Sequence, residues 1–186
     1  MKTEMPGVRP PVKLHLGCGS VVIPGFTGID IRPFPNVMTC PVDNLGIWRD
    51  NSVDLIYACH VLEHFKRRDT QRVLREWYRV LRPEGTLRLS VPDFDACVKA
   101  YRVGRAPLAL LLGHLVGGQE YPENIHYMVF DWQYLSTLLS EVGFRRIRYW
   151  DWRRTEHAAY DDRSRGYFPH MDEGGILMSL NVECDK

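Results

Sequence analysis

The sequence lacks the features that mark several classes of protein. Its longest apolar run, residues 108–112, is far too short for a membrane-spanning helix. No apolar stretch of signal-peptide length follows the first residues. The 5 cysteines are odd in number and form no CxxC pair, which disfavours a disulfide framework or a zinc ribbon. We therefore expect a soluble, cytoplasmic protein with reduced thiols and no membrane span.

A strong excess of charge is also missing. The chain has 24 Lys and Arg against 23 Asp and Glu, for a formal net charge of +1. This balance gives no sign of the basic surface that nucleic-acid binding requires, and it weakly disfavours a nucleic-acid partner. With 186 residues, 45% hydrophobic and 25% charged, the chain has the size and composition of one globular domain spanning 1–186.

What the sequence does contain is an alternation of short apolar runs with helical patterns, which favours a parallel sheet covered by helices. The predicted strands cover residues 12–16, 26–31, 37–40, 53–59, 86–91, 144–150 and 176–183. The predicted helices cover residues 69–82, where Pro83-Glu84-Gly85 ends the helix, and 131–142. The last strand alternates strictly and is expected to be antiparallel. Residues 151–175 fit neither period, and an irregular stretch of that length is typical of a functional segment.

Two glycines follow the first predicted strand directly, in the order Gly17-Cys18-Gly19. Glycines in that place let the backbone approach a ligand closely, because no Cβ atom obstructs it. Asp30 ends the next strand, eleven residues after Gly19. A carboxylate there can accept hydrogen bonds from both ribose hydroxyls of a nucleoside. The pattern predicts a nucleotide-type site at the carboxyl ends of the first strands.

The segments LHLGCGS, GIDI, PVDNLG, VDLIYACHVLEHF and RVLRPEGTLRLSVPDF follow one another in this order. Together they closely resemble the class I S-adenosylmethionine-dependent methyltransferases, and within these the small enzymes associated with polysaccharide biosynthesis. The resemblance implies a Rossmann-like α/β fold with a seven-stranded sheet in the order 3-2-1-4-5-7-6. It also implies a cofactor-binding core at residues 12–94 and S-adenosylmethionine as the cofactor. The usual third glycine is Val21 here, and the short gap before Asp30 predicts abbreviated early helices.

The resemblance implies cofactor-binding roles at the ends of the first strands for Gly17, Cys18, Gly19, Asp30, Ile31, Asp43, Asn44, Cys59 and His60. The Gly17–Gly19 loop would contact the methionine and ribose, and Asp30 would hold the ribose hydroxyls. Ile31 and the Asp43-Asn44 pair would meet the adenine. The backbone at Cys59 and His60 would line the methionine end. Since no dinucleotide-type GxGxxG is present, a nicotinamide cofactor is disfavoured.

Transfer of a methyl group to a hydroxyl needs a base, and histidine is the commonest choice. We expect His126 to be this base, with His60 as the next candidate. Asp161, Asp162 and Asp172 would either orient this histidine or hydrogen-bond the hydroxyls of a sugar. Residues 104–130 and 151–175 are the expected substrate-side segments. His60 and His64 in HVLEH lack the glutamate beside the first histidine and a third ligand, so no metal site is expected.

The sequence contains fewer features that point to the methyl acceptor than to the cofactor. The (Asp/Asn)-Pro-Pro-(Tyr/Phe) motif of amino-directed nucleic-acid methyltransferases is absent, which further disfavours a nucleic-acid base as acceptor. By analogy with the polysaccharide-associated enzymes, we expect O-methylation of a small or glycan-like hydroxyl acceptor. The alternatives are N- or S-methylation of a metabolite or peptide, and a non-catalytic adenosyl-binding regulatory subunit. The oligomeric state stays open.

Overall fold

The computed structural model describes residues 9–103, 106–160, 162–170 and 172–186. The strands are β1 (Lys13–Leu16), β2 (Thr27–Asp30), β3 (Met38–Thr39), β4 (Val53–Cys59), β5 (Leu81–Pro92), β6 (Arg145–Tyr149), β7 (Tyr167–Phe168), β8 (Ile176–Leu177) and β9 (Ser179–Asp185). The helices are α1 (Arg67–Val80), α2 (Phe94–Arg102), α3 (Leu108–Val116) and α4 (Trp132–Val142), with 3-10 turns η1 (Leu62–His64), η2 (Pro122–Asn124), η3 (Trp152–Arg154) and η4 (Arg163–Arg165). No helix in these ranges has the length and apolar character needed to cross a bilayer.

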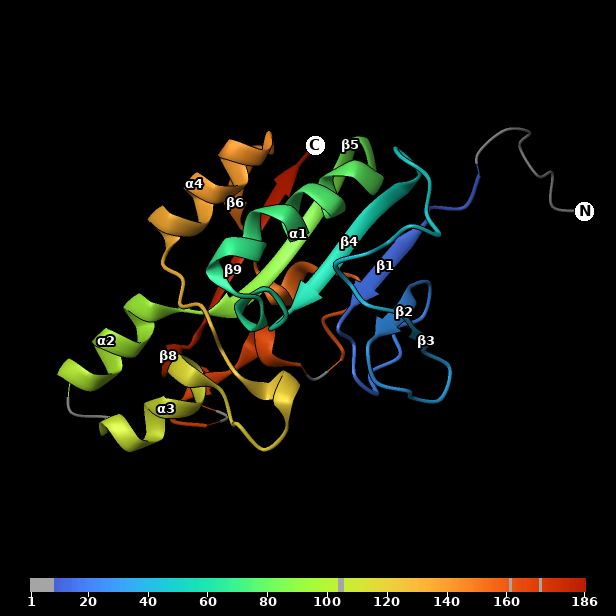
Figure 1. The fold of residues 1–186 in the computed structure, drawn as a ribbon. Coiled ribbons are helices and arrows are strands. Elements are labelled where there is room, and N and C mark those ends of the chain that lie inside the picture. The colour runs from blue at the N-terminus through green and yellow to red at the C-terminus, as the bar shows by residue number, and fades with distance from the viewer. Residues whose placement is uncertain (1–8, 104–105, 161, 171) are drawn as a thin grey trace, which may run out of the picture.

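Seven strands form one twisted sheet in the order β3-β2-β1-β4-β5-β9-β6 (Figure 1). Strands β1 to β5 pair with their neighbours in parallel. Strand β9 lies antiparallel between β5 and β6. This arrangement confirms the Rossmann-like fold and the order 3-2-1-4-5-7-6, with β9 as the seventh strand. It also brings the carboxyl ends of β1, β2 and β4 to one edge, where ligands bind in open α/β sheets.

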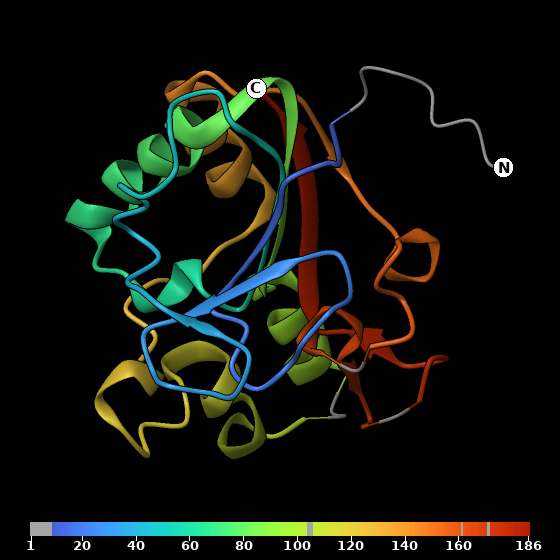
Figure 2. The same ribbon diagram turned by 90° about the vertical axis from the view of Figure 1, so that its right-hand side faces the viewer.

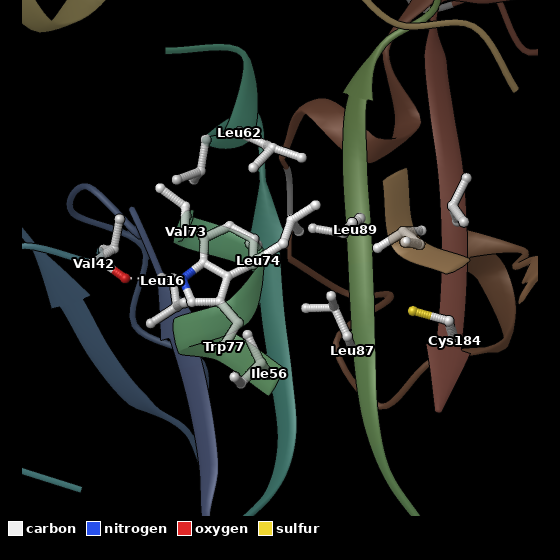
Figure 3. Close-up of a cluster of buried hydrophobic side chains, with 14 of the residues drawn as sticks. Leu16, Val42, Ile56, Leu62, Val73, Leu74, Trp77, Leu87, Leu89 and Cys184 are labelled. Atoms are coloured by element: carbon white, nitrogen blue, oxygen red, sulfur yellow. Dashed lines mark hydrogen bonds between the residues drawn. The ribbon is translucent and has the colours of Figure 1, made fainter. Parts of the chain in front are cut away.

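Helices α1 and α4 cover one face of the sheet (Figure 2). The inward stripe of α1 carries Val73, Leu74, Trp77 and Val80, which are all fully buried at helical spacing. Figure 3 shows Trp77 packed among side chains of the sheet and α1, with its indole N–H donating to the carbonyl of Val42 at 2.8 Å. This hydrogen bond lets a large ring with a polar atom sit in the core without leaving a donor unpaired.

On the opposite face of the sheet lie residues 151–160 and 162–165, which form 3-10 turns and irregular chain (Figure 2). The sheet presents rings on this side: His15 stacks on Tyr57 at 5.0 Å between centroids, and Tyr57 stacks on His157 at 4.0 Å. The Tyr57 hydroxyl donates to Asp162 at 2.5 Å. The polar and aromatic residues of this segment therefore have partners on a polar and aromatic face of the sheet.

The first two crossovers are short. Residues 17–26 and 31–37, all described, form turns and contain no helix. This confirms the predicted abbreviation of the early helices. On the second face, near β1 and β2, Lys13 pairs with Glu156 at 3.0 Å and the ring of Phe26 meets that of His157 edge to face.

Two predicted boundaries were wrong. Strand β5 begins at Leu81, five residues before the predicted start, because Leu81 already pairs with Val53 of β4. The helix therefore ends at Val80, before the Pro83-Glu84-Gly85 breaker. The predicted strand at 176–183 is interrupted at Met178, since β8 pairs with β7 in a separate two-stranded sheet while β9 stays in the main one. Pairing with distant strands decided both boundaries.

Candidate functional site

A cavity of about 1000 Å³ lies at the carboxyl ends of β1, β2 and β4. It is at the upper end of the ~300–1,000 Å³ range of small-molecule sites, so it has room for a cofactor and an acceptor together. Among its lining residues are these predicted site residues: Gly17, Cys18, Gly19, Asp30, Ile31, Asp43, Cys59, His60 and His126. Asn44 lies outside it, in a separate depression with Arg72 and Glu76. Asp161 lies outside the described residues.

The glycine loop after β1 needs both of its glycines. Gly17 has φ +61°, and a Cβ atom there would lie 2.4 Å from Cγ2 of Val61. Gly19 has φ +54°, and a Cβ atom there would meet nothing within 4 Å. Left-handed backbone favours glycine at both positions. At Gly17 the close approach of Val61 adds to this, while Gly19 exposes bare backbone to the cavity.

Asp30 ends β2 with a buried carboxylate in the wall of the cavity. One of its oxygens accepts the Gly19 N–H at 2.8 Å, and the other accepts the Arg32 N–H at 2.9 Å. Each carboxylate oxygen has about two acceptor positions, so each keeps one for a ligand. Asp30 therefore ties the glycine loop to β2 and can still accept two hydroxyl groups.

The side chains of Cys18 and Ile31, which lie beside the glycines and Asp30, are oriented differently. Cys18 is buried, and its Sγ would lie 3.0 Å from a Cβ atom on Gly28, so its side chain packs toward β2. Burial raises the pKa of its thiol to about 11. Ile31 is 55% exposed and lines the cavity, where it offers an apolar surface to a flat ring. Cys18 can serve a ligand through its backbone, and Ile31 through its side chain.

Asp43 reaches the cavity from the loop after β3, but its carboxylate is not free. Its Oδ2 accepts a hydrogen bond from Arg72 of α1 at 2.8 Å. The ion pair fixes the orientation of the side chain and leaves the second oxygen available to an amino group. Sequence reasoning placed Asp43 and Asn44 together, but the chain turns between them and only Asp43 lines the cavity.

Strand β4 delivers Cys59 and His60 to the far wall. Burial raises the pKa of the Cys59 thiol far above its usual range, which makes it a poor nucleophile. His60 has φ +54°, a conformation in which non-glycine residues are uncommon. Its N–H donates to Ser90 of β5 at 2.8 Å, which holds this strained turn in place. The turn aims the chain into η1 and sets the imidazole at the cavity.

A cluster of three histidines surrounds a buried glutamate on this wall. Glu63 is 0% exposed, and its Oε1 lies 3.3 Å from Nδ1 of His60 and 3.9 Å from Nε2 of His126. The rings of His64 and His126 meet edge to face at 4.8 Å between centroids. The N–H groups of Tyr127 and Met128 donate to the Glu63 carbonyl at 2.8 and 3.2 Å, which fastens the 126–128 segment to η1.

Burial sets the charge of this cluster. It raises the pKa of the Glu63 carboxyl to about 8. It lowers the pKa of His126 to about 4, and it lowers that of His60 well below the usual range. Both imidazoles are therefore neutral near pH 7. Sequence reasoning weighed only the histidines of HVLEH and missed Glu63, although the motif contains it; His114 and Arg163, which also line the cavity, were missed too.

The other polar residues of 151–175 have structural partners. Asp162 accepts from the Tyr57 hydroxyl and from the N–H of Ser164, while its side chain still borders the cavity. Asp172 accepts from the N–H of Gly174 within its own turn. His157 is buried against Tyr57 on the second sheet face. Within the described part of this segment, Asp162 and Arg163 reach the cavity.

Comparisons with known proteins agree with this architecture. Residues 27–89 match the family described as "Methyltransferase domain". No curated protein sequence matches significantly. Among solved structures, an S-adenosylmethionine-dependent methyltransferase from Archaeoglobus fulgidus aligns with a TM-score of 0.57 at 13% identity, covering 95% of this chain and 86% of that one. The 1,6-didemethyltoxoflavin-N1-methyltransferase of Burkholderia thailandensis, solved with 1,6-didemethyltoxoflavin and S-adenosylhomocysteine, aligns at 0.58 and 17%, covering 96% and 72%.

At these identities the structural likeness concerns the fold. The sheet order is that of the aligned methyltransferases, and the match at 27–89 lies in the part of the chain that holds Asp30, so both support a methyltransferase. The domain match supports an enzyme that transfers methyl groups. The cavity fits an adenosyl group, since bare backbone at Gly19, a carboxylate with free acceptor positions and an apolar side chain all line it.

Proposed function

We propose that the protein transfers the methyl group of S-adenosylmethionine to a hydroxyl group of a small or glycan-like acceptor. The observation that carries this proposal is the His126 imidazole, which borders the same cavity as the glycine loop and Asp30. Its Nδ1 lies 3.0 Å from the carbonyl oxygen of His114. Because a carbonyl can only accept, Nδ1 carries the proton and Nε2 keeps a lone pair.

On the cofactor side, we assign the ribose hydroxyls to the two free acceptor positions of Asp30. The backbone of Gly17 to Gly19 holds the methionine portion, and Ile31 packs on the adenine. Asp43 accepts from the adenine amino group through the oxygen that Arg72 leaves free. Backbone groups at Cys59 and His60 border the methionine end, next to the histidine cluster.

When bound, S-adenosylmethionine supplies an electrophilic methyl group and leaves as S-adenosylhomocysteine. The acceptor oxygen forms the new bond to carbon, and its proton passes to Nε2 of His126. A pKa of about 4 makes this imidazole a modest base, since general bases work best with a pKa near the working pH. Most of the rate enhancement then comes from holding the two reactants in line within the cavity.

The rim of the cavity supports a polyhydroxyl acceptor. Glu120, Glu123 and Asn124 line it and offer acceptor oxygens and amide groups. Tyr121 lies beneath the Arg32 guanidinium, 4.5 Å from its ring centroid to the guanidinium carbon. These groups match the hydrogen-bonding demand of a sugar better than that of an apolar molecule. The resemblance to polysaccharide-associated methyltransferases points the same way, as analogy.

The test is a panel of acceptors incubated with the protein and S-adenosylmethionine, with release of S-adenosylhomocysteine as the readout. We expect turnover with monosaccharide or oligosaccharide hydroxyls. Turnover only with amines or thiols would replace O-methylation by N- or S-methylation. Tight binding of S-adenosylhomocysteine without turnover on any acceptor would favour a non-catalytic adenosyl-binding subunit and overturn the proposal.

A further inference from the structure

We infer that Glu63, His64 and His126 form a binding site for a divalent metal ion of the zinc class at the inner wall of the cavity. One nitrogen from each imidazole and one carboxylate oxygen lie within 4.8 Å of one another. His64 belongs to η1 and His126 to the segment after η2, so the set forms only in the folded chain.

The carboxylate of Glu63 has no partner that accounts for its burial. Its side chain is 0% exposed. Neither of its oxygens accepts a hydrogen bond from the described residues. Burying such a group without a partner costs several kcal/mol, so buried carboxylates are normally paired, hydrogen-bonded or bound to metal. Arg163 borders the same cavity but does not hydrogen-bond to this carboxylate.

Both imidazoles are oriented as metal ligands usually are. Nδ1 of His64 lies 3.1 Å from the Ile125 carbonyl oxygen, and Nδ1 of His126 lies 3.0 Å from that of His114. Since carbonyl oxygens only accept, each Nδ1 carries the proton and each Nε2 has a lone pair. A ligating histidine almost always donates its other N–H in this way, which fixes its tautomer and orientation.

His60 places a further hydrogen-bond acceptor beside the Glu63 carboxyl. Ser179 donates its hydroxyl to the Arg163 carbonyl at 2.6 Å, so its oxygen accepts from Nε2–H of His60 at 2.9 Å. A neutral His60 then presents the lone pair of Nδ1 to Oε1 of Glu63, 3.3 Å away. While the Glu63 carboxyl is protonated, its O–H can donate to this nitrogen, but once it is ionised the two lone pairs face each other. A cation between these acceptors would take the place of that proton.

The donor set indicates the type of ion. Two imidazoles and one carboxylate are the ligands of many catalytic zinc sites, which keep a fourth position open. Two ligand atoms ~2.1 Å from a tetrahedral zinc ion lie ~3.4 Å apart. Oε1 of Glu63 and Nε2 of His126 are 3.9 Å apart, so small side-chain rotations bring them into range. Because His64 and His126 both line the cavity, the open position faces it.

The metal site stands on its own geometry, whereas its role rests on the proposed function. With the ion in place, Nε2 of His126 is a ligand and no longer a base. The ion itself would polarise an acceptor hydroxyl at the open position, which makes loss of the proton easier. No metal site was expected from the sequence, because the third ligand, His126, stands 62 residues beyond His64.

The test starts from full-length protein stripped with a chelator and dialysed. Calorimetric titration with Zn²⁺ is expected to show one ion per chain, and Co²⁺ is expected to give the visible absorption bands of a tetrahedral site. Glu63→Gln keeps the shape of the side chain, and with His126→Ala it is expected to weaken Zn²⁺ binding by ~10²-fold or more, since even outer-shell changes cost ~10–100-fold. His170→Ala removes an exposed histidine and controls for surface binding.

Each variant is also titrated with S-adenosylhomocysteine, which shows that the protein is folded. Stoichiometric Zn²⁺ binding that is lost in Glu63→Gln and His126→Ala, and kept in His170→Ala, supports the site. No binding by the wild type, or equal binding by Glu63→Gln, overturns it even if methyl transfer is intact. A metal site without turnover on any acceptor would instead count against the proposed function alone.

Discussion

Replacing Asp30 by alanine removes a carboxylate that serves the glycine loop and, in our proposal, the ribose of the cofactor. The loop loses the acceptor for the Gly19 N–H at 2.8 Å and for the Arg32 N–H at 2.9 Å. The cofactor loses two hydrogen bonds to a charged group. Such bonds contribute ~1.5–3 kcal/mol, so the Kd of S-adenosylhomocysteine is expected to rise about 10- to 150-fold.

Asp30→Asn separates the two contributions. The amide keeps one oxygen that can accept a backbone N–H, but it loses the charge and the second acceptor. We expect its Kd to fall between those of the wild type and Asp30→Ala. The alanine variant leaves two backbone N–H groups without their partner, so it is also expected to lose ~1–3 kcal/mol of unfolding free energy.

The assay is calorimetric titration with S-adenosylhomocysteine beside urea denaturation of the same samples. Asp54→Ala is the matched control, because Asp54 also accepts a backbone N–H, that of Val12 at 2.7 Å, at a place outside the cavity lining. It is expected to lower stability and leave the Kd unchanged. NAD is expected to give no heat with any variant. A folded Asp30→Ala variant with wild-type affinity would refute the assignment of Asp30 to the ribose.

Three further outcomes are expected. His126→Ala should lower kcat by ~10²–10⁴-fold while the Kd of S-adenosylhomocysteine stays within about twofold, and unchanged kcat across pH 6–9 would place the base elsewhere. Burial, together with the nearby Arg88 charge, lowers the pKa of His157 to about 4. Between pH 6.5 and 4 the unfolded chain therefore binds more protons than the folded one. The free energy of unfolding should fall by up to ~3 kcal/mol as the pH drops through this window. His157→Gln should flatten this slope in thermal melts, and an identical slope would contradict the reasoning. Trp77→Ala should lower the free energy of unfolding by ~3–5 kcal/mol in urea denaturation. This loss should be well above that of Trp132→Ala, because Trp132 is only half-buried. Equal losses would argue against Trp77 as the centre of the core.

Local patterns predicted those parts of the fold that depend on neighbouring residues. Helix α4 begins where predicted because the Asp131 side chain accepts the Tyr134 N–H, and it ends where Gly143 adopts the left-handed conformation. Strand β4 has the predicted bounds, residues 53–59. The glycine loop and Asp30 could be placed in one cavity because adjacent parallel strands end at the same edge of a sheet.

Boundaries that depend on distant partners were not predictable in this way. Strand β5 extends back to Leu81 because β4 offers it a pairing partner, and the predicted last strand divides at Met178 because β8 pairs with β7. The segment from residue 151 showed no period in the sequence. Its buried residues, among them His157, pack on a sheet face whose rings, such as that of Tyr57, stack with them.

The sequence by itself therefore determined the order of the sheet and the edge at which the expected site residues gather, because repeated local spacing carries that information. Only the tertiary structure decided the environment of Glu63. Backbone hydrogen bonds from residues 127 and 128 to the Glu63 carbonyl bring His126 beside a turn that lies some sixty residues earlier. Burial then removes water from the carboxyl group and the imidazoles, which raises the pKa of Glu63 and lowers that of His126. No spacing in the chain encodes that encounter, since it depends on how two distant segments pack.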